Sequence, residues 1–152
     1  MIILHRGPRF TYDGFGNNTG VQAAGSTLVT RQYEADNGNL ASVQYGNGYT
    51  YLYTYDDLDR VTELRLKDPE DQEYVLYRYE YGQEGNLSAV YDIREDIGRE
   101  TIVTRYYYDM SGRLIYTRND QDEDYRYTYD LNNNLVKVEQ VVPAVPAARY
   151  QK

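Results

Sequence analysis

Residues 125–138 read Tyr-Arg-Tyr-Thr-Tyr-Asp-Leu-Asn-Asn-Asn-Leu-Val-Lys-Val, and near-copies of this stretch recur upstream. In an extended backbone Tyr125, Tyr127 and Tyr129 lie on one face, because strand side chains alternate with a period of two. Asp130 then opens a turn, and the last four residues form a short return strand. The stretch therefore predicts a β-hairpin whose apolar area comes mostly from tyrosine.

The clearest copy is Tyr108-Asp109-Met110-Ser111-Gly112-Arg113-Leu114. Counting Tyr108 as position 1, the turn-opening aspartate is position 2, the glycine is position 5 and the leucine is position 7. The same frame occurs at residues 12–17, 34–40 (degenerate at its start), 55–61, 81–87 and 129–135. The residues at position 5 are Gly16, Gly38, Asp59, Gly85, Gly112 and Asn133, with spacings of 22, 21, 26, 27 and 21 residues. A period of this size is typical of repeat proteins, in which a single unit cannot bury its apolar face alone.

Turn chemistry selects the same register as the periodicity. A short hairpin connection built from a type I turn and a bulge needs a residue with positive φ at its end. Glycine adopts positive φ without steric cost, and Asn and Asp are the next most tolerant residues. All six residues at position 5 belong to these types. The turn-opening aspartates, which can bond to the backbone two residues on, are Asp13, Asp56, Asp109 and Asp130.

These patterns predict an all-β fold of tandem hairpins that form a curved antiparallel sheet strip. We expect a lead-in segment at residues 1–9, a six-unit repeat array at residues 10–140 and a tail with Pro and Ala at residues 141–152. Asn47-Gly48, between apolar alternations, predicts a two-residue hairpin turn. Leu87 and Val90 are three residues apart, so only a bulge would place both on one face.

Composition excludes several classes of function. The chain has 152 residues, 24 acidic and 16 basic residues and a formal charge of −8, which argues against a nucleic-acid partner because phosphate binding needs a basic patch. No apolar run is long enough to predict membrane insertion. Met1-Ile2-Ile3-Leu4 is too short for the apolar core of a signal peptide.

The sequence has few residues that could act in catalysis or bind a cofactor. We therefore predict no enzyme activity, no metal and no cofactor. Cysteine is absent, and His5 is the only histidine, which leaves little for a nucleophilic triad or a zinc site. Asp120, Asp122 and Asp124 alternate like the start of a calcium loop, but Tyr125 stands where that loop needs glycine. We interpret residues 119–124 as a solvated acidic turn.

The motif at residues 106–114, Tyr-Tyr-Tyr-Asp-Met-Ser-Gly-Arg-Leu, resembles the YD repeat of the RHS family, and the resemblance extends from Phe10 to Val138. Relatives include bacterial polymorphic toxins, shell components of insecticidal toxin complexes and the teneurins of animal cell surfaces. The resemblance implies a β-sheet strip that spirals into a hollow shell, as a fragment of a larger secreted or cell-surface bacterial protein. In the toxins such a shell encloses an effector, which a self-cleaving core releases; neither that core nor a toxin domain is recognisable here.

The sequence therefore predicts a non-catalytic structural segment of such a shell, with neighbouring repeats as its partners. The alternative is a module that binds carbohydrate or peptide through exposed tyrosine stripes. The residues of these stripes are Tyr77, Tyr79, Tyr81, Tyr125, Tyr127 and Tyr129. Because a short strip has two unpaired edges, we also expect self-association through sheet edges.

Overall fold

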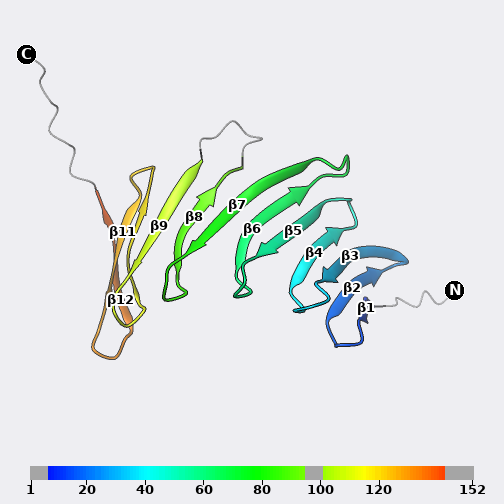
Figure 1. Cartoon of the computed structure of the whole chain (residues 1–152), viewed down its shortest axis with the longest axis horizontal. Coiled ribbons are helices and arrows are strands. Elements are labelled where there is room, and N and C mark those ends of the chain that lie inside the picture. Colours follow the sequence, from blue (N-terminus) through cyan, green and yellow to red (C-terminus); the bar gives the residue numbers. More distant parts are fainter. Residues whose placement is uncertain (1–6, 95–100, 143–152) are drawn as a thin grey trace, which may run out of the picture. The chain divides into compact units, whose positions relative to one another are not determined.

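A computed structural model describes residues 7–94 and 101–142 of the chain. Residues 1–6, with His5, and residues 143–152, which make up most of the predicted tail, lie outside the described residues, as do residues 95–100 of the connection expected before the fifth repeat. The described chain consists of β-strands joined by turns, which confirms the predicted all-β class (Figure 1).

The chain divides into two compact units. The first unit contains residues up to Arg78 together with Ile93 and Arg94, and the second contains residues 79–92 and those from 101 onward. The strands of the first unit are β1 (Arg9–Tyr12), β2 (Asn18–Ala23), β3 (Ser26–Tyr33), β4 (Leu40–Tyr45), β5 (Thr50–Tyr55), β6 (Val61–Lys67) and the first part of β7 (Glu73–Tyr81). The second unit holds the end of β7, β8 (Leu87–Asp92), β9 (Ile102–Tyr108), β10 (Leu114–Asn119), β11 (Asp124–Tyr129) and β12 (Leu135–Val141).

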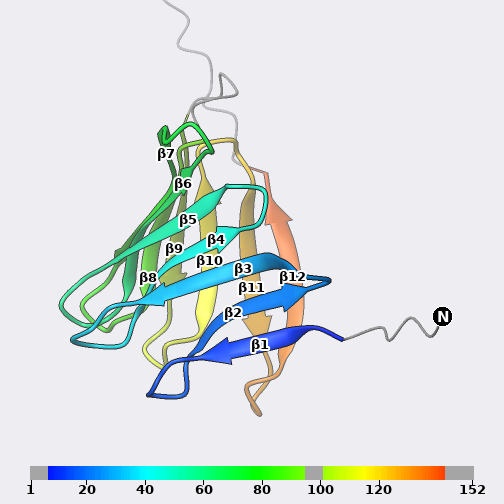
Figure 2. The ribbon, with the colours of Figure 1, turned by 90° about the vertical axis from the view of Figure 1, so that its right-hand side faces the viewer.

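Strands pair antiparallel with their neighbours in sequence. In the first unit, β1 to β6 follow one another across the sheet, and β7 pairs with β6. In the second unit, β8 pairs with β9, and β10, β11 and β12 follow in order. Among the described strands, β1 and β12 each have a neighbour on one side only, and Figure 2 shows β1 nearest the viewer. The tandem antiparallel hairpins that the repeats predict are therefore confirmed.

A β-bulge recurs at the start of the return strands β2, β4, β6, β10 and β12. In the β5–β6 hairpin, Thr54 pairs with Glu63 and Tyr55 with Val61, so the register skips Thr62. Equivalent skips fall at Thr19, Ala41, Ile115 and Val136. An extra residue restores a common face to side chains three apart, which explains the apolar spacing of positions 7 and 10 in the repeats.

Few side chains are fully covered. Among the described residues, the buried hydrophobic side chains are Val43, Ala89 and Val103. Most tyrosines are half-buried, which suits a residue with an apolar ring and a polar tip. The sheet is therefore stabilised mainly by contacts between neighbouring strands.

The turn at Asn47-Gly48 differs from the predicted two-residue type. A type I′ turn needs positive φ at both central residues, yet of this pair only Gly48 has it, with φ of 92°. Gly48 N donates to Tyr45 O at 2.9 Å, and Tyr45 N donates to Tyr49 O at 2.8 Å. The hairpin exists, but residues 46–48 form its loop, so the prediction of a two-residue turn was wrong. A two-residue turn with positive φ at both residues is found instead at Ala24 and Gly25, with φ of 51° and 82°.

Candidate functional site

The turn between β9 and β10 shows how the repeat motif builds its local structure. Asp109 N donates to Arg113 O at 2.9 Å, and Gly112 N donates to Asp109 O at 3.0 Å. Asp109 Oδ1 accepts hydrogen bonds from the backbone N–H groups of Ser111 and Arg113, at 2.9 and 3.0 Å. Its Oδ2 accepts one from Arg113 Nε at 2.7 Å. Gly112 closes the turn with φ of 74°.

The other turn-opening aspartates repeat this geometry. Each Oδ1 accepts from the backbone N–H groups two and four residues on, and each Oδ2 accepts from the side chain four residues on. The pairs formed with that side chain are Asp13 with Asn17, Asp56 with Arg60 and Asp130 with Asn134. Positive φ at the fifth position is found at Gly16, Gly38, Asp59, Gly85, Gly112 and Asn133.

These hydrogen bonds lower the pKa of the turn-opening carboxyl groups. For Asp109 the largest cause is the backbone N–H of Arg113, followed by the Arg113 side chain, and its pKa lies below the ordinary value of 3.8. The Asn134 side chain is the first cause of the lowered pKa of Asp130. For Asp13, desolvation acts in the opposite direction, but the bonds from Asn17 outweigh it and the pKa is lowered. The ionised form of each carboxylate is therefore part of the folded turn.

Two repeats depart from this pattern. In the second repeat Glu34 replaces the aspartate and the turn is one residue longer, because Gly38 N donates to Glu34 O four residues earlier, at 3.1 Å. The extra residue explains why this copy is degenerate in sequence. In the fourth repeat Gly82 occupies the aspartate position, so its turn is closed by the backbone bonds of Gly82 with Gly85 and Asn86.

Successive repeats are linked by the hydroxyl group of the position 1 tyrosine. Tyr129 Oη donates to the carbonyl oxygen of Leu114, position 7 of the preceding repeat, at 2.9 Å. The same bond from position 1 to the preceding position 7 joins Tyr33 to Asn18, Tyr55 to Leu40 and Tyr108 to Leu87. Tyr33 makes this bond despite the longer turn that follows it, so it holds position 1 of the second repeat.

A second link joins position 6 of one repeat to position 5 of the next. Arg113 Nη1 donates to Asn133 Oδ1 at 2.7 Å, and Asn39 Nδ2 donates to Asp59 Oδ1 at 2.7 Å. Arg113 also stacks on the ring of Tyr129, with 5.0 Å between its Cζ atom and the ring centroid. Arg113 thus connects its own turn to both the tyrosine and the turn of the following repeat.

The predicted tyrosine stripes are half-buried. Tyr125, Tyr127 and Tyr129 alternate along β11 with the exposed residues Arg126 and Thr128. Along β7, Tyr77, Tyr79 and Tyr81 are likewise half-buried. The structure therefore places each set on one face of its strand, and the hydroxyl of Tyr129 donates to the preceding repeat.

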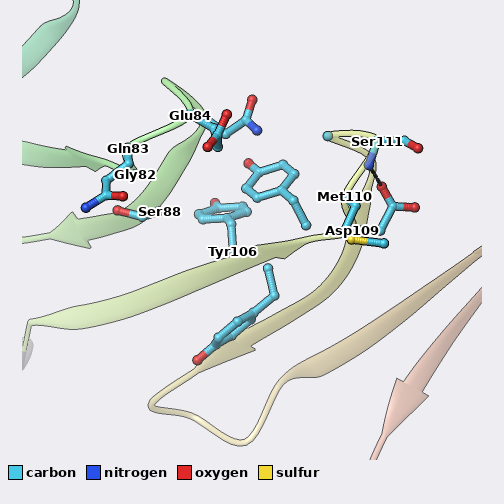
Figure 3. A pocket seen from close by; sticks show the side chains of 12 residues that line it. Gly82, Gln83, Glu84, Ser88, Tyr106, Asp109, Met110 and Ser111 are labelled. Atoms are coloured by element: carbon cyan, nitrogen blue, oxygen red, sulfur yellow. Dashed lines mark hydrogen bonds between the residues drawn. The ribbon is translucent and has the colours of Figure 1, made fainter.

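A hollow of about 820 Å³ lies between the turns of the fourth and fifth repeats. Figure 3 shows the turn that carries Gln83 and Glu84 facing the turn that carries Met110 and Ser111. The hollow forms where the link from position 6 to position 5 is missing: a Cβ added to Gly112 would lie 3.8 Å from the amide nitrogen of Asn86. It is lined by aromatic, amide, hydroxyl and carboxylate groups.

Two of the turns that link one repeat to the next use the same chemistry, which the sequence analysis did not identify. Asp68 Oδ1 accepts from the backbone N–H groups of Glu70 and Gln72, and Asp71 has φ of 65°. Asn119 acts in the same way before Asp122, whose φ is 57°. The shared spacing, an Asp or Asn three residues before an Asp, was a signal that could have found both.

Asp124 corrects the interpretation of residues 119–124 as a wholly solvated turn. This residue begins β11 and is only 5% exposed, and its Oδ2 accepts a hydrogen bond from Tyr116 Oη at 2.5 Å. That bond is the main cause of the raised pKa of Tyr116. Asp120 and Asp122 are exposed. In the described part of the chain, no three His, Cys, Asp or Glu side chains are grouped closely enough to hold a metal ion.

Among the residues that the structure describes, there is no helix with the length and apolar character needed to cross a membrane.

Comparison with known proteins identifies relatives of this repeat. The family model described as RHS Repeat matches residues 33–70. Teneurin-3 of Mus musculus is 32% identical over 89 residues, which make up 56% of this chain and 3% of the teneurin.

Solved structures of bacterial toxin complexes share the fold. The crystal structure of TcdB2-TccC3 matches with a TM-score of 0.70 and 22% identity, over 90% of this chain and 8% of that chain. A structure of the Photorhabdus luminescens Tc holotoxin pore matches over the same shares, with a TM-score of 0.68 and 22% identity. The chain thus spans less than a tenth of the length of these relatives. These comparisons identify an RHS repeat at residues 33–70 of this chain and, over most of its length, the fold of these toxin-complex structures.

Proposed function

We propose that this chain is a non-catalytic structural segment of an RHS/YD-repeat shell wall, within a larger secreted or cell-surface bacterial protein. In that role it would contribute to enclosing a cargo or to a surface scaffold. The observation that carries the proposal is the bond from four position 1 tyrosine hydroxyls to the position 7 carbonyl of the preceding repeat. A side chain that bonds to backbone can join any two successive repeats, whatever their other residues are.

The use of the turn carboxylates supports a structural rather than a catalytic role. A general acid or base needs a carboxyl group that is able to exchange a proton with a substrate. Asp56 and Asp109 instead accept hydrogen bonds at both oxygens from groups of their own turns. Their lowered pKa values favour the charged form, because the hydrogen bonds from Arg60 and Arg113 stabilise the carboxylates.

The proposal is tested by removing single tyrosine hydroxyl groups. We expect Tyr55→Phe, Tyr108→Phe and Tyr129→Phe each to lower the free energy of unfolding by about 0.5–1.5 kcal/mol, because each leaves a backbone carbonyl without its partner. Tyr12→Phe is the matched control, since Tyr12 is 62% exposed and precedes the other repeats. Urea unfolding measures all four variants. If the three interior variants unfold with the same free energy as the wild type, the tyrosine bonds between repeats do not stabilise the chain, and the proposal is contradicted.

The alternative function, binding of a carbohydrate or peptide, is supported by the hollow between the fourth and fifth turns. Tyr107, 44% exposed, lies among its lining residues, as do Glu84, Ser88 and Asn86. Aromatic faces beside amide, hydroxyl and carboxylate groups suit a sugar ring or an extended peptide. The half-buried tyrosine stripes offer less ring surface to such a ligand.

A glycan array followed by titration with tyrosine fluorescence tests this alternative. Binding that is lost in Tyr107→Ala and kept in Tyr49→Ala, a tyrosine of similar exposure outside the hollow, would support it. A flat response across the array and across extended peptides would exclude it.

A further inference from the structure

The hollow between the turns of the fourth and fifth repeats lies at a junction without a side-chain link. At the junction of the fifth and sixth repeats, Arg113 at position 6 donates to Asn133 at position 5 and stacks on the ring of Tyr129. At the junction of the fourth and fifth repeats, the residue at position 6 is Asn86 and the residue at position 5 is Gly112. Glycine has no side chain that could accept a hydrogen bond, so this junction lacks the link.

The junction of the first and second repeats shows the same combination. Its residue at position 6 is Asn17 and its residue at position 5 is Gly38, and it also has a hollow, of about 350 Å³. There Asn17 Nδ2 donates to Asp13 Oδ2 at 3.0 Å. In the fourth repeat Gly82 replaces that aspartate, and the hollow is larger, at about 820 Å³. Asparagine followed by glycine at these positions is therefore associated with a hollow between repeats.

The larger hollow contains polar groups that the chain leaves without partners. Asn86 and Ser88 line it and are half-buried. Within the described residues, neither side chain forms a hydrogen bond. Polar groups that are partly removed from water are usually hydrogen-bonded, so these two favour a ligand that bonds to them.

The charge of the lining favours a cation. The lining includes the carboxylates of Glu84 and Asp109 but no lysine or arginine. Asp109 accepts hydrogen bonds at both oxygens from its own turn, which leaves the Glu84 carboxylate for a ligand (Figure 3). The whole chain carries a formal charge of −8, so its field attracts cations and repels anions.

We propose that this hollow binds the guanidinium group of an arginine side chain in an extended peptide. The bound group takes the place that Arg113 fills at the next junction. Its face stacks on Tyr108, the counterpart of Tyr129, and its N–H groups donate to the Glu84 carboxylate and to Asn86 Oδ1. A guanidinium is planar and has five donors, so it can stack and donate at the same time. The proposal rests on the alternative function given above, binding of a peptide in this hollow, and specifies the group that is recognised.

Three peptides of glycine and serine test the proposal, each capped at both ends, with arginine, lysine or citrulline at the centre. Citrulline keeps the planar head group of arginine without its charge. Isothermal titration calorimetry measures the affinity of each peptide for the whole chain. We expect the arginine peptide to bind roughly tenfold more tightly than the citrulline peptide, because hydrogen bonds to charged groups are the stronger ones. The lysine peptide is expected to bind more weakly than the arginine peptide, because an ammonium group has no planar face to stack.

Gly112→Asn is designed to close the hollow without disturbing the turn. Asn133 has positive φ, 65°, at the same position of the next repeat, and a Cβ at Gly112 would make an ordinary contact of 3.8 Å with Asn86 Nδ2. The new amide oxygen accepts from Asn86 as in the linked junctions, so the arginine peptide is expected to lose its binding while the urea midpoint does not fall. Gly16→Asn is the matched control, because it changes position 5 of the first repeat, outside both hollows.

Glu84→Gln tests the carboxylate that the guanidinium is proposed to meet. We expect this variant to bind the arginine peptide roughly tenfold more weakly and the citrulline peptide about as well as the wild type does. Glu70→Gln is its matched control, because it removes the same charge from an exposed turn outside the hollow.

Several outcomes would overturn the inference. These are equal affinity for the arginine peptide and either of the other two, arginine binding that persists in Gly112→Asn, and no binding of any peptide. The alternative function fails on different evidence, a flat response of the glycan array and of all extended peptides. A glycan or an uncharged peptide whose binding is lost in Tyr107→Ala would support that function and at the same time overturn the assignment to arginine.

Discussion

At the level of single residues, position 5 decides the path of the backbone in each hairpin. Glycine meets the requirement for positive φ at least cost. Asp59 and Asn133 carry a side chain there and use it to accept a hydrogen bond from the preceding repeat. Residue choice at position 5 therefore balances backbone strain against a link between repeats.

The first repeat offers a test of the backbone requirement alone. Gly14 and Gly16 belong to one turn, and a Cβ added at either residue meets no atom within 4 Å. Only Gly16 has positive φ, at 90°. We expect Gly16→Ala to destabilise the first hairpin by about 1–2 kcal/mol, and Gly14→Ala to leave its stability unchanged or slightly raised. Amide hydrogen exchange in β2 reports this, and equal protection in the two variants would show that φ is not the constraint.

The turn-opening aspartates make the stability of the folded chain depend on pH in the acidic range. The pKa values of Asp13, Asp56, Asp109 and Asp130 lie below 3.8 in the folded chain, so folding favours their ionised form. Their contribution is complete above the ordinary pKa and is lost as the pH falls through the lowered values. We expect the melting temperature to be flat above about pH 5 and to fall steeply below about pH 4.

Asp109→Asn is the variant that isolates this effect, because an amide oxygen still accepts the two backbone bonds but carries no charge. Its melting temperature is expected to be lower than that of the wild type at pH 7 and to decrease less between pH 5 and pH 3. A variant with the acid dependence of the wild type would show that the Asp109 carboxylate does not contribute.

At the level of elements, the hairpins differ from one another in the length of their turn and in the residue that opens it. The turn between β7 and β8 lacks the aspartate, and the second repeat has a longer turn, yet in both repeats the return strand follows. The backbone bonds that close each turn are therefore sufficient to form a hairpin, and the carboxylate adds stability to it.

Restoring the aspartate in the fourth repeat is expected to stabilise the chain. Gly82 does not have positive φ, and a Cβ there would make an ordinary contact of 3.7 Å with Asn86 O. Gly82→Ala should add about 0.4–1 kcal/mol by restricting the unfolded chain. Gly82→Asp should add more, because its carboxylate can accept from the backbone N–H groups of Glu84 and Asn86. Urea unfolding ranks the three proteins, and a Gly82→Asp variant no more stable than Gly82→Ala would contradict the role of the carboxylate.

At the level of the whole molecule, stability comes from many contacts between neighbours rather than from a central core. The described chain has few buried hydrophobic side chains, and its strand contacts join elements adjacent in sequence. Such a chain tolerates variation in any one repeat, but its excess of negative charge opposes folding throughout.

Removing exposed negative charges tests whether their mutual repulsion destabilises the folded chain. The side chains of Asp57, Glu70 and Glu84 lie in exposed turns. We expect the triple variant Asp57→Asn, Glu70→Gln and Glu84→Gln to melt at a higher temperature than the wild type in low salt. The difference should shrink in high salt, because salt already screens the repulsion. A variant that melts lower at every salt concentration would mean that these carboxylates make favourable contacts.

Sequence patterns were enough to predict the hairpins and the residue with positive φ in their turns. These features depend on local rules: strand side chains alternate, and only a few residue types tolerate left-handed backbone. The same locality explains why turn-opening residues such as Asp109 could be found without a structure. The rule applies equally to Asp71 and Asp122, which lie outside the tyrosine frame.

The groups that join one repeat to the next could be identified only from the three-dimensional arrangement of the strands. The partner of Tyr129 is a carbonyl group 15 residues earlier, at the start of β10, where the register of the β9–β10 pair shifts. The burial of Asp124 likewise depends on the strand beside it, from which Tyr116 donates. Register is set by the pairing of neighbouring strands and by the bulges at their starts, and the alternation of side chains within one strand specifies neither of them.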